Sequence, residues 1–144
     1  MRVEGADGLR LPPPVFEDMQ AEVRDFRPSD AEDRVGAALV VRFPVLERYQ
    51  NPMGMMQGGV LAAAVDNVIG PLSYLVAPPS VTAQLAMTYL APVTPDVETI
   101  EVEARLTSRA GRQLVIDATV RALDGTELAL CRATQTIVRR REAG

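Results

Sequence analysis

The sequence of 144 residues contains no histidine, no lysine and no tryptophan, and all 15 of its basic residues are arginine. These absences exclude a Ser-His-Asp triad, a Cys-His pair, a histidine-ligated zinc site, a Schiff-base lysine and a Walker lysine. Acid–base chemistry near neutral pH is left to carboxylates, tyrosines, the backbone and one cysteine.

Cys131 is that single cysteine, so an intrachain disulfide cannot form. Its neighbours Ala129 and Leu130 predict a buried thiol rather than a nucleophile. A net charge of −4 disfavours a general role in binding nucleic acid. We expect no metal site.

One window, residues 60–79, is apolar enough to raise the question of a membrane span. It carries Asp66 and Asn67 near its middle and a Gly70-Pro71 break, and a central Asp costs about 2.5–3.5 kcal/mol on insertion scales. The first residues lack an apolar signal core. We therefore expect no membrane association and a cytoplasmic location.

The length and a hydrophobic content of 47% fit one globular domain. We expect an N-terminal extension packed on the domain (1–34), the domain itself (35–138) and an arginine-rich tail (139–144). Within the extension, Phe16, Met19 and Val23 lie at helical spacing and favour a short helix.

Apolar residues alternate with polar ones in several segments, which predicts strands. A stretch from residue 58 to the mid-70s has the spacing of a helix that is buried on most sides, and Pro71 is expected to kink or end it. The expected strands cover 35–43, 81–89, 100–107, 114–121 and 126–138, with a hairpin turn at Asp124-Gly125. The order predicts an α+β domain whose antiparallel sheet covers one apolar helix.

Two features of the helix could carry chemistry. Gly58 and Gly59 open it, where free N–H groups and the positive end of the helix dipole can hold an anion or a developing oxyanion. A merely flexible helix start is the alternative. Asp66 lies in an otherwise apolar stretch, where an ionised carboxylate is costly. It is either functional or satisfied by neighbouring groups.

Gly58 and Asp66 are eight positions apart, which is about 12 Å along a straight helix. A general base must come within about 3 Å of its target. One chain cannot easily bring both groups to one carbonyl, but two antiparallel helices around a two-fold axis can. A functional interpretation thus predicts a homodimer with two composite sites.

Several residues together resemble a known family: Asn51, Gln57-Gly58-Gly59, Asp66-Asn67, Thr82 and the strand end 87–92. They are similar to the hotdog-fold acyl-CoA thioesterases of the phenylacetate-degradation type, over about residues 35–138. The resemblance implies a sheet wrapped around one long helix. It also implies dimers with a continuous sheet, which often pair into tetramers.

The resemblance implies that Asp66 is the general base or nucleophile acting on a thioester. The Gly58 N–H would polarise the thioester carbonyl from the partner subunit. Asn51 would lie near the carbonyl or the leaving sulfur, and Thr82 would help to hold Asp66 or the attacking water. Coenzyme A enters as part of the substrate, and no other cofactor is implied.

The family motif commonly begins with histidine where this chain has Gln57, which cannot titrate. Orientation or hydrogen bonding can survive this change, whereas proton shuttling cannot. A protein that binds acyl-CoA or an acyl carrier without hydrolysis is therefore the alternative. A hotdog hydratase or dehydratase is a remote third option. Such enzymes are typified by an Asp/His or Glu/His pair, and this chain has no histidine.

Substrate binding is predicted at two places. Arg109 and Arg112 flank a turn, and their guanidinium groups could bind the phosphates of coenzyme A. The alternative is a hairpin turn whose arginines are simply solvated. Gly59 lets a ligand approach the backbone closely, and Met55 and Met56 can line an adaptable acyl pocket or simply pack on the helix. The acyl group itself is not identified.

Overall fold

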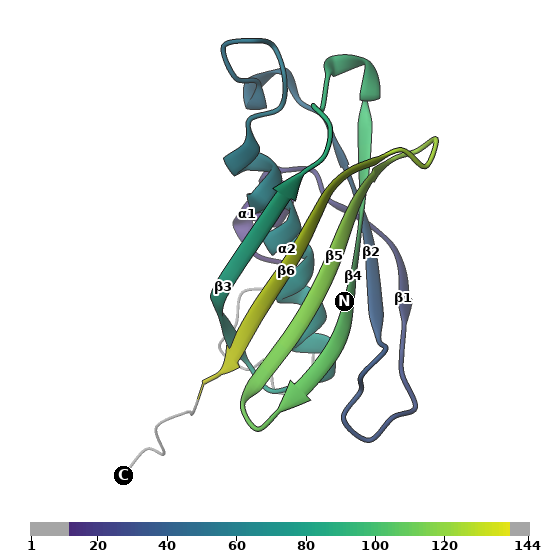
Figure 1. The fold of residues 1–144 in the computed structure, drawn as a ribbon, viewed down its shortest axis with the longest axis vertical. Coiled ribbons are helices and arrows are strands. Elements are labelled where there is room, and N and C mark those ends of the chain that lie inside the picture. Colours follow the sequence, from purple (N-terminus) through teal and green to yellow (C-terminus); the bar gives the residue numbers. More distant parts are fainter. Residues whose placement is uncertain (1–11, 139–144) are drawn as a thin grey trace.

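One long helix, α2 (Gly58–Val76), lies against one face of a six-stranded antiparallel sheet (Figure 1). The computed structural model describes residues 12–138. The strands stand in the order β1-β2-β4-β5-β6-β3, so β1 and β3 form the two edges. Their bounds are β1 Glu22–Arg27, β2 Ala38–Pro44, β3 Ser80–Tyr89, β4 Thr99–Ala110, β5 Gln113–Ala122 and β6 Glu127–Ile137.

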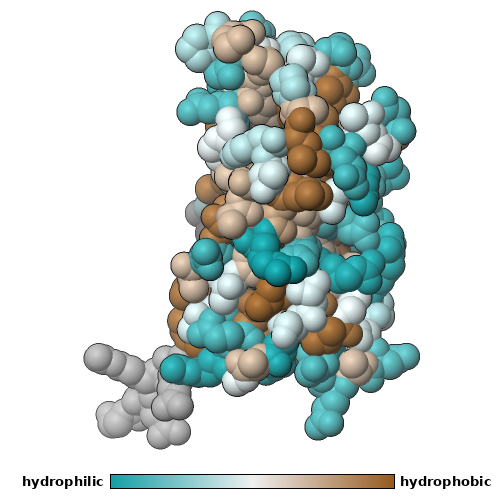
Figure 2. All heavy atoms as spheres, in the orientation of Figure 1, coloured by the Kyte–Doolittle hydropathy of each residue, from teal (hydrophilic) through white to brown (hydrophobic). Residues whose placement is uncertain are grey.

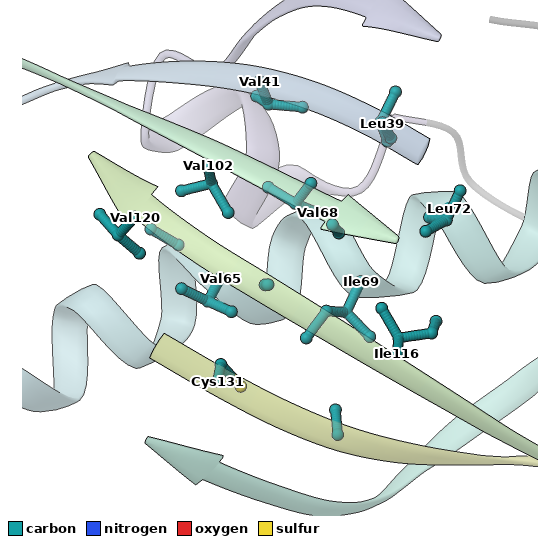
Figure 3. Close-up of a cluster of buried hydrophobic side chains, with 14 of the residues drawn as sticks. Leu39, Val41, Val65, Val68, Ile69, Leu72, Val102, Ile116, Val120 and Cys131 are labelled. Atoms are coloured by element: carbon teal, nitrogen blue, oxygen red, sulfur yellow. The ribbon is translucent and has the colours of Figure 1, made fainter. Parts of the chain in front are cut away.

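The predicted strands and helix are confirmed, with small shifts at their ends. Alternate residues of four strands point toward α2 and bury its apolar stripe, as Figure 3 shows. The labelled members of this core are Leu39, Val41, Val65, Val68, Ile69, Leu72, Val102, Ile116, Val120 and Cys131. Gly125 adopts φ +95° in the expected hairpin turn, a conformation that favours glycine. The α+β class is thus confirmed, with the helix as its centre.

Pro71 does not end α2, and the predicted extent of the helix into the mid-70s is confirmed. The helix continues to Val76, and Pro71 itself is buried. Gly70 precedes it, and a glycine lacks the Cβ that makes the helical conformation costly before proline. By length and composition α2 also suffices to cross a membrane, but this is weak support for a span because the buried core helix of a soluble protein passes the same test.

The sheet begins inside the segment expected to be an N-terminal extension. Helix α1 (Pro14–Asp18) is followed by β1, which pairs with β2. Phe16 and Met19 are buried, whereas Val23 lies in β1 rather than in the expected helix. Every residue of β1 is exposed, so the strand lacks the alternation that reveals the others. The tail 139–144 and residues 1–11 lie outside the described residues.

A β-bulge interrupts β3 where it pairs with β6. The register shifts between Thr82 and Gln84, so that Thr82 lies opposite Gln135 and Leu85 lies opposite Ala133. A regular alternation along β3 would place Thr82 and Gln84 on one face, whereas the shifted register places them on opposite faces. The extra residue turns Thr82 to the inner face, toward α2.

The outer face of the sheet carries ion pairs between neighbouring strands. Arg132 makes two hydrogen bonds to Asp117 (2.7 and 2.9 Å), and Arg42 contacts Glu101 at 2.9 Å. Figure 2 shows hydrophilic residues spread over this face with hydrophobic ones between them. Asp66 and Thr82, which are predicted to carry chemistry, lie on the opposite face of the sheet, the one that α2 covers.

Candidate active site

A pocket of about 330 Å³ opens at the start of α2. It brings together four of the predicted site residues, Asn51, Met55, Met56 and Gly58. The end of β3 and the residues after it complete the wall, from Tyr89 to Val93. Within residues 12–138, neither the Gly58 nor the Gly59 N–H donates to another group, as expected for a first helical turn. The pocket therefore offers free backbone donors at the positive end of the helix dipole.

Asn51 holds the methionine loop through its side-chain oxygen. Asn51 Oδ1 accepts hydrogen bonds from the N–H groups of Met53 (2.9 Å) and Met55 (3.1 Å). Two backbone donors identify this atom as the carbonyl oxygen, so the Nδ2 amide is left to face a ligand. Asn51 can thus donate a hydrogen bond to an acceptor such as a thioester oxygen or sulfur.

Tyr89 fixes the first turn of α2. Its hydroxyl donates to the Gly58 carbonyl at 2.5 Å, and burial, followed by the nearby Cys131, raises the pKa of Tyr89 and keeps the phenol protonated. A Cβ on Gly58 would lie 3.2 Å from the Tyr89 ring, which is tighter than ordinary contact. Glycine at position 58 therefore lets Tyr89 approach the helix without displacement of its ring.

Asp66 lies two turns further along α2 and is half-buried. The Thr82 hydroxyl donates to Asp66 Oδ1 at 2.9 Å. Within the described chain no donor lies on Asp66 Oδ2. One carboxylate oxygen is thus anchored, and the other is free to take a proton or to attack.

The two groups occur in one unbroken helix, which keeps Gly58 and Asp66 about 12 Å apart along its axis. Asp66 does not line the pocket at the helix start. Within one chain, the pocket at Gly58 and the Asp66 carboxylate are therefore separate.

The remaining predicted residues lie apart from the pocket. Gln57 precedes α2 with an exposed side chain that does not cap the helix, and Gly59 is exposed beside it. Arg109 and Arg112 flank the β4–β5 turn, close to the end of α2, since Arg112 O accepts from Ile137 N and Pro79 O accepts from Val138 N. One chain does not bring either arginine to its own pocket.

Cys131 is the buried thiol that the sequence predicted. Burial, with the charge of Asp66 as a second cause, raises the pKa of Cys131 to about 11. It is therefore a neutral thiol at physiological pH. Among residues 12–138, no group of His, Cys, Asp and Glu side chains is placed to hold a metal ion.

Sequence reasoning missed the polar residues behind Asp66. Gln135 donates to Thr82 at 2.7 Å although it is buried among apolar side chains of β6. Its signal was available, because a glutamine interrupts the apolar alternation Cys131, Ala133, Ile137. Tyr89 as a wall of the pocket was also missed.

A single long helix wrapped by an antiparallel sheet defines the class of protein. The family model of the thioesterase superfamily matches residues 53–129, which include α2 and most of the sheet. The chain therefore belongs to the thioesterase superfamily. Among curated proteins, none matches this sequence.

Solved structures share the fold. The PaaI protein of the Escherichia coli phenylacetic acid degradation operon superposes with a TM-score of 0.75 at 14% identity, covering 89% of this chain and 86% of its own. A putative thioesterase of Ralstonia eutropha, related to phenylacetic acid degradation, gives 0.75 at 23% identity, covering 91% and 95%.

A hypothetical thioesterase of Streptococcus pneumoniae, solved with coenzyme A, gives 0.71 at 19% identity, covering 85% and 91%. The fold of this chain is therefore the hotdog fold, of the PaaI-like type.

Proposed function

We propose that this protein is an acyl-CoA thioesterase that hydrolyses a thioester to a free acid and coenzyme A. The observation that carries the proposal is the asymmetric Asp66, with Oδ1 held by Thr82 and Oδ2 free. Membership in the thioesterase superfamily and a relative solved with coenzyme A support the class of substrate.

Each active site is composed of two chains in this proposal. Gly58 and Asn51 of one protomer hold the thioester, and Asp66 of the other protomer acts on it. The unbroken α2 supports this division, because it keeps the two half-sites of one chain about 12 Å apart. The dimer forms along the β3 edge, and pairing of dimers into a tetramer remains a prediction.

In the general-base route, Asp66 Oδ2 takes a proton from water, and the hydroxide oxygen adds to the thioester carbon. The carbonyl oxygen becomes an oxyanion that accepts from the Gly58 N–H at the positive end of α2. Collapse breaks the carbon–sulfur bond, and the thiolate takes the proton from Asp66. The products are the acid and the free thiol, so atoms and charge balance.

In the nucleophilic route, Oδ2 attacks the thioester carbon, expels the thiolate and forms a mixed anhydride that water then opens. In a single turnover in ¹⁸O-labelled water, label on Asp66 identifies an anhydride that water opens at the Asp66 carbonyl. Direct attack places the label in the acid, whereas opening of the anhydride at the Asp66 carbonyl leaves the label on Asp66.

The arginines at the β4–β5 turn are proposed to hold the phosphates of coenzyme A in the neighbouring protomer. In an antiparallel pair of chains, the end of α2 in one protomer lies toward the start of α2 in the other. This arrangement carries Arg109 and Arg112 toward the partner's pocket. Met55 and Met56 are proposed to contact the acyl group.

The test is release of free thiol from a panel of acyl-CoA substrates by the wild type and by Asp66→Asn. Loss of a general base costs about 10²- to 10⁴-fold in rate. We expect that loss with the oligomer unchanged in light scattering. Equal turnover by the two proteins would refute the proposal.

Gln57 favours one second candidate, an acyl-CoA or acyl-carrier binding protein without hydrolysis, because it replaces a titratable side chain by an amide. That candidate predicts ligand-dependent thermal stabilisation of the wild type with no thiol released over hours. Both outcomes are read from the same samples.

A further inference from the structure

A chain of polar side chains runs from Asp66 into the apolar core. Ser73, Ser80 and Gln135 are 0%, 5% and 1% exposed. Buried polar groups are costly unless they are hydrogen-bonded, and within the described residues no buried side-chain nitrogen or oxygen lacks a partner. Apolar side chains would fill this part of the core at a lower cost in free energy. The hydrogen-bond partners of the polar side chains therefore indicate their role.

The connection starts at the proposed catalytic carboxylate. Thr82 Oγ1 lies 2.9 Å from Asp66 Oδ1 and 2.7 Å from Gln135 Nε2. Gln135 Oε1 lies 3.3 Å from Ser80 Oγ, which is 3.1 Å from Ser73 Oγ. Ser73 finally donates to the Gly70 carbonyl at 2.6 Å, inside α2. The chain therefore returns to the helix that carries Asp66.

An ionised Asp66 sets the direction of these hydrogen bonds. A carboxylate only accepts, so the single hydroxyl proton of Thr82 points to Asp66. Thr82 Oγ1 can then only accept from Gln135, which requires the Nε2 donor to face it. Gln135 Oε1 is left toward Ser80, whose one hydroxyl proton lies within reach of both Gln135 Oε1 and Ser73 Oγ. Gln135 thereby keeps Thr82 in the donating orientation.

The backbone is built around this contact. The bulge in β3 turns Thr82 to the inner face, directly opposite Gln135 on β6. Without the bulge, Thr82 would share the outer face with Gln84. Bulges next to active sites re-aim a side chain in this way. Two local features, a buried glutamine and a bulge, therefore converge on one hydroxyl.

We propose that Gln135 is a positioning residue for hydrolysis: through Thr82 it orients the Asp66 carboxylate so that Oδ2 faces the thioester. This inference rests on the proposed function and extends it to a residue that touches neither substrate nor Asp66. Gln135 holds the Thr82 proton on Oδ1, which leaves Oδ2 as the oxygen that reacts.

A residue that acts in this way changes kcat more than KM, because it orients the reacting group without binding the substrate. Misplacement of a reacting group by about 1 Å costs about 10²-fold in rate. We expect Gln135→Met to lower kcat about 10- to 100-fold, with KM within about twofold of the wild type.

The decisive experiment is a double-mutant cycle on thiol release with Gln135→Met, Thr82→Val and the combined variant. If Gln135 acts through Thr82, the second substitution has nothing left to remove, and kcat of the combined variant equals that of Thr82→Val. Thr82→Ser keeps the hydroxyl and is expected to restore most of kcat. Gln113→Met is the matched control, since Gln113 accepts from Thr136 at 3.0 Å on the exposed outer face of the sheet.

Two results overturn the proposal: kcat of Gln135→Met within twofold of the wild type, or a full additional loss when it is combined with Thr82→Val. Circular dichroism checks that each variant folds. Where Gln135→Met does not fold, Gln135→Glu takes its place. It has a similar shape but presents an acceptor to Thr82, and we expect the same loss of kcat. A wild type without thiol release refutes the proposed function instead, so the two failures are distinguishable.

Discussion

The two edges of the sheet are built in opposite ways. β1 has charges at four of its six positions, and these form the ion pairs Arg24–Glu22 (2.8 Å) and Arg27–Asp25 (3.0 Å). β3 has ten residues and no charge among them. Free strand edges invite pairing with other chains, and proteins commonly block them with charges and bulges.

The difference indicates which edge is kept open. β1 also has a bulge between Val23 and Asp25, so both charge and irregularity protect it. β3 has a bulge too, but that bulge turns Thr82 toward Asp66. We therefore interpret β1 as the closed edge and β3 as the edge that joins a second copy and completes the site.

The largest effect is expected from charging the open edge. Gln84→Glu with Ala86→Glu places four carboxylates on two facing β3 strands, while Ala86 lies opposite Arg132 within its own sheet, which favours the fold. We expect light scattering to give a monomer and thiol release to fall by about 10²-fold or more.

The matched control charges the closed edge. Val23→Glu with Phe26→Glu alters two exposed apolar residues of β1 and should leave both mass and activity unchanged. A dimer that persists with charged β3, or dissociates with charged β1, would reverse the assignment of the two edges.

The next effect concerns the pocket beside the end of β3. Asn51→Asp keeps an oxygen for the N–H groups of Met53 and Met55 but replaces the Nδ2 donor by a negative oxygen. We expect about a 10²-fold loss of kcat with an unchanged melting temperature, measured on the same preparation. Full activity would show that Asn51 serves the loop alone.

A smaller effect is expected at the β4–β5 turn. Arg109→Gln with Arg112→Gln should raise KM for acyl-CoA about tenfold while leaving kcat within a factor of two. An acyl thioester of N-acetylcysteamine, which lacks the nucleotide, should show no change. Arg121→Gln serves as the control on the outer face, where Arg121 lies near Glu103. An equal rise in KM for both substrates would argue against phosphate binding here.

The smallest effect concerns Cys131, which lies opposite Met87 of β3. Its folded pKa of about 11 exceeds its ordinary value of 9.0, so the folded state keeps a proton that the unfolded state loses. This contribution to stability is complete below pH 9 and is lost as the pH rises toward 11. Urea unfolding should therefore show a steeper fall in stability over that range for the wild type than for Cys131→Ala. Identical slopes would contradict the assigned pKa.

Much of the fold could be predicted from local pattern. The alternation in residues 35–138 and the helical spacing after Gly58 indicated five strands and α2, because apolar residues recur in each at the period of its secondary structure. β1 was not predicted, because all of its residues are exposed and it lacks an apolar face. The extent of α2 into the mid-70s was also predicted, and Gly70 explains why Pro71 does not end the helix.

The site was predictable in part for the same reason. Asp66 and the Gly58 N–H were apparent as a charge in an apolar stretch and as a helix start, both local features. The Thr82–Gln135 contact depends on the register of β3 against β6, 53 residues apart in the chain, and on a bulge that alternation conceals. The register between strands that are far apart in the chain is difficult to predict from a single sequence.

The central claim is that each site takes one half from each chain. Asn51→Asp and Asp66→Asn are co-expressed with different affinity tags, and the heterodimer is isolated over both tags in succession. Sites shared between chains leave one intact site per heterodimer, so we expect about half of the wild-type rate of thiol release although each parent homodimer is slower by about 10²-fold or more. A heterodimer as inactive as its parents would contradict the account.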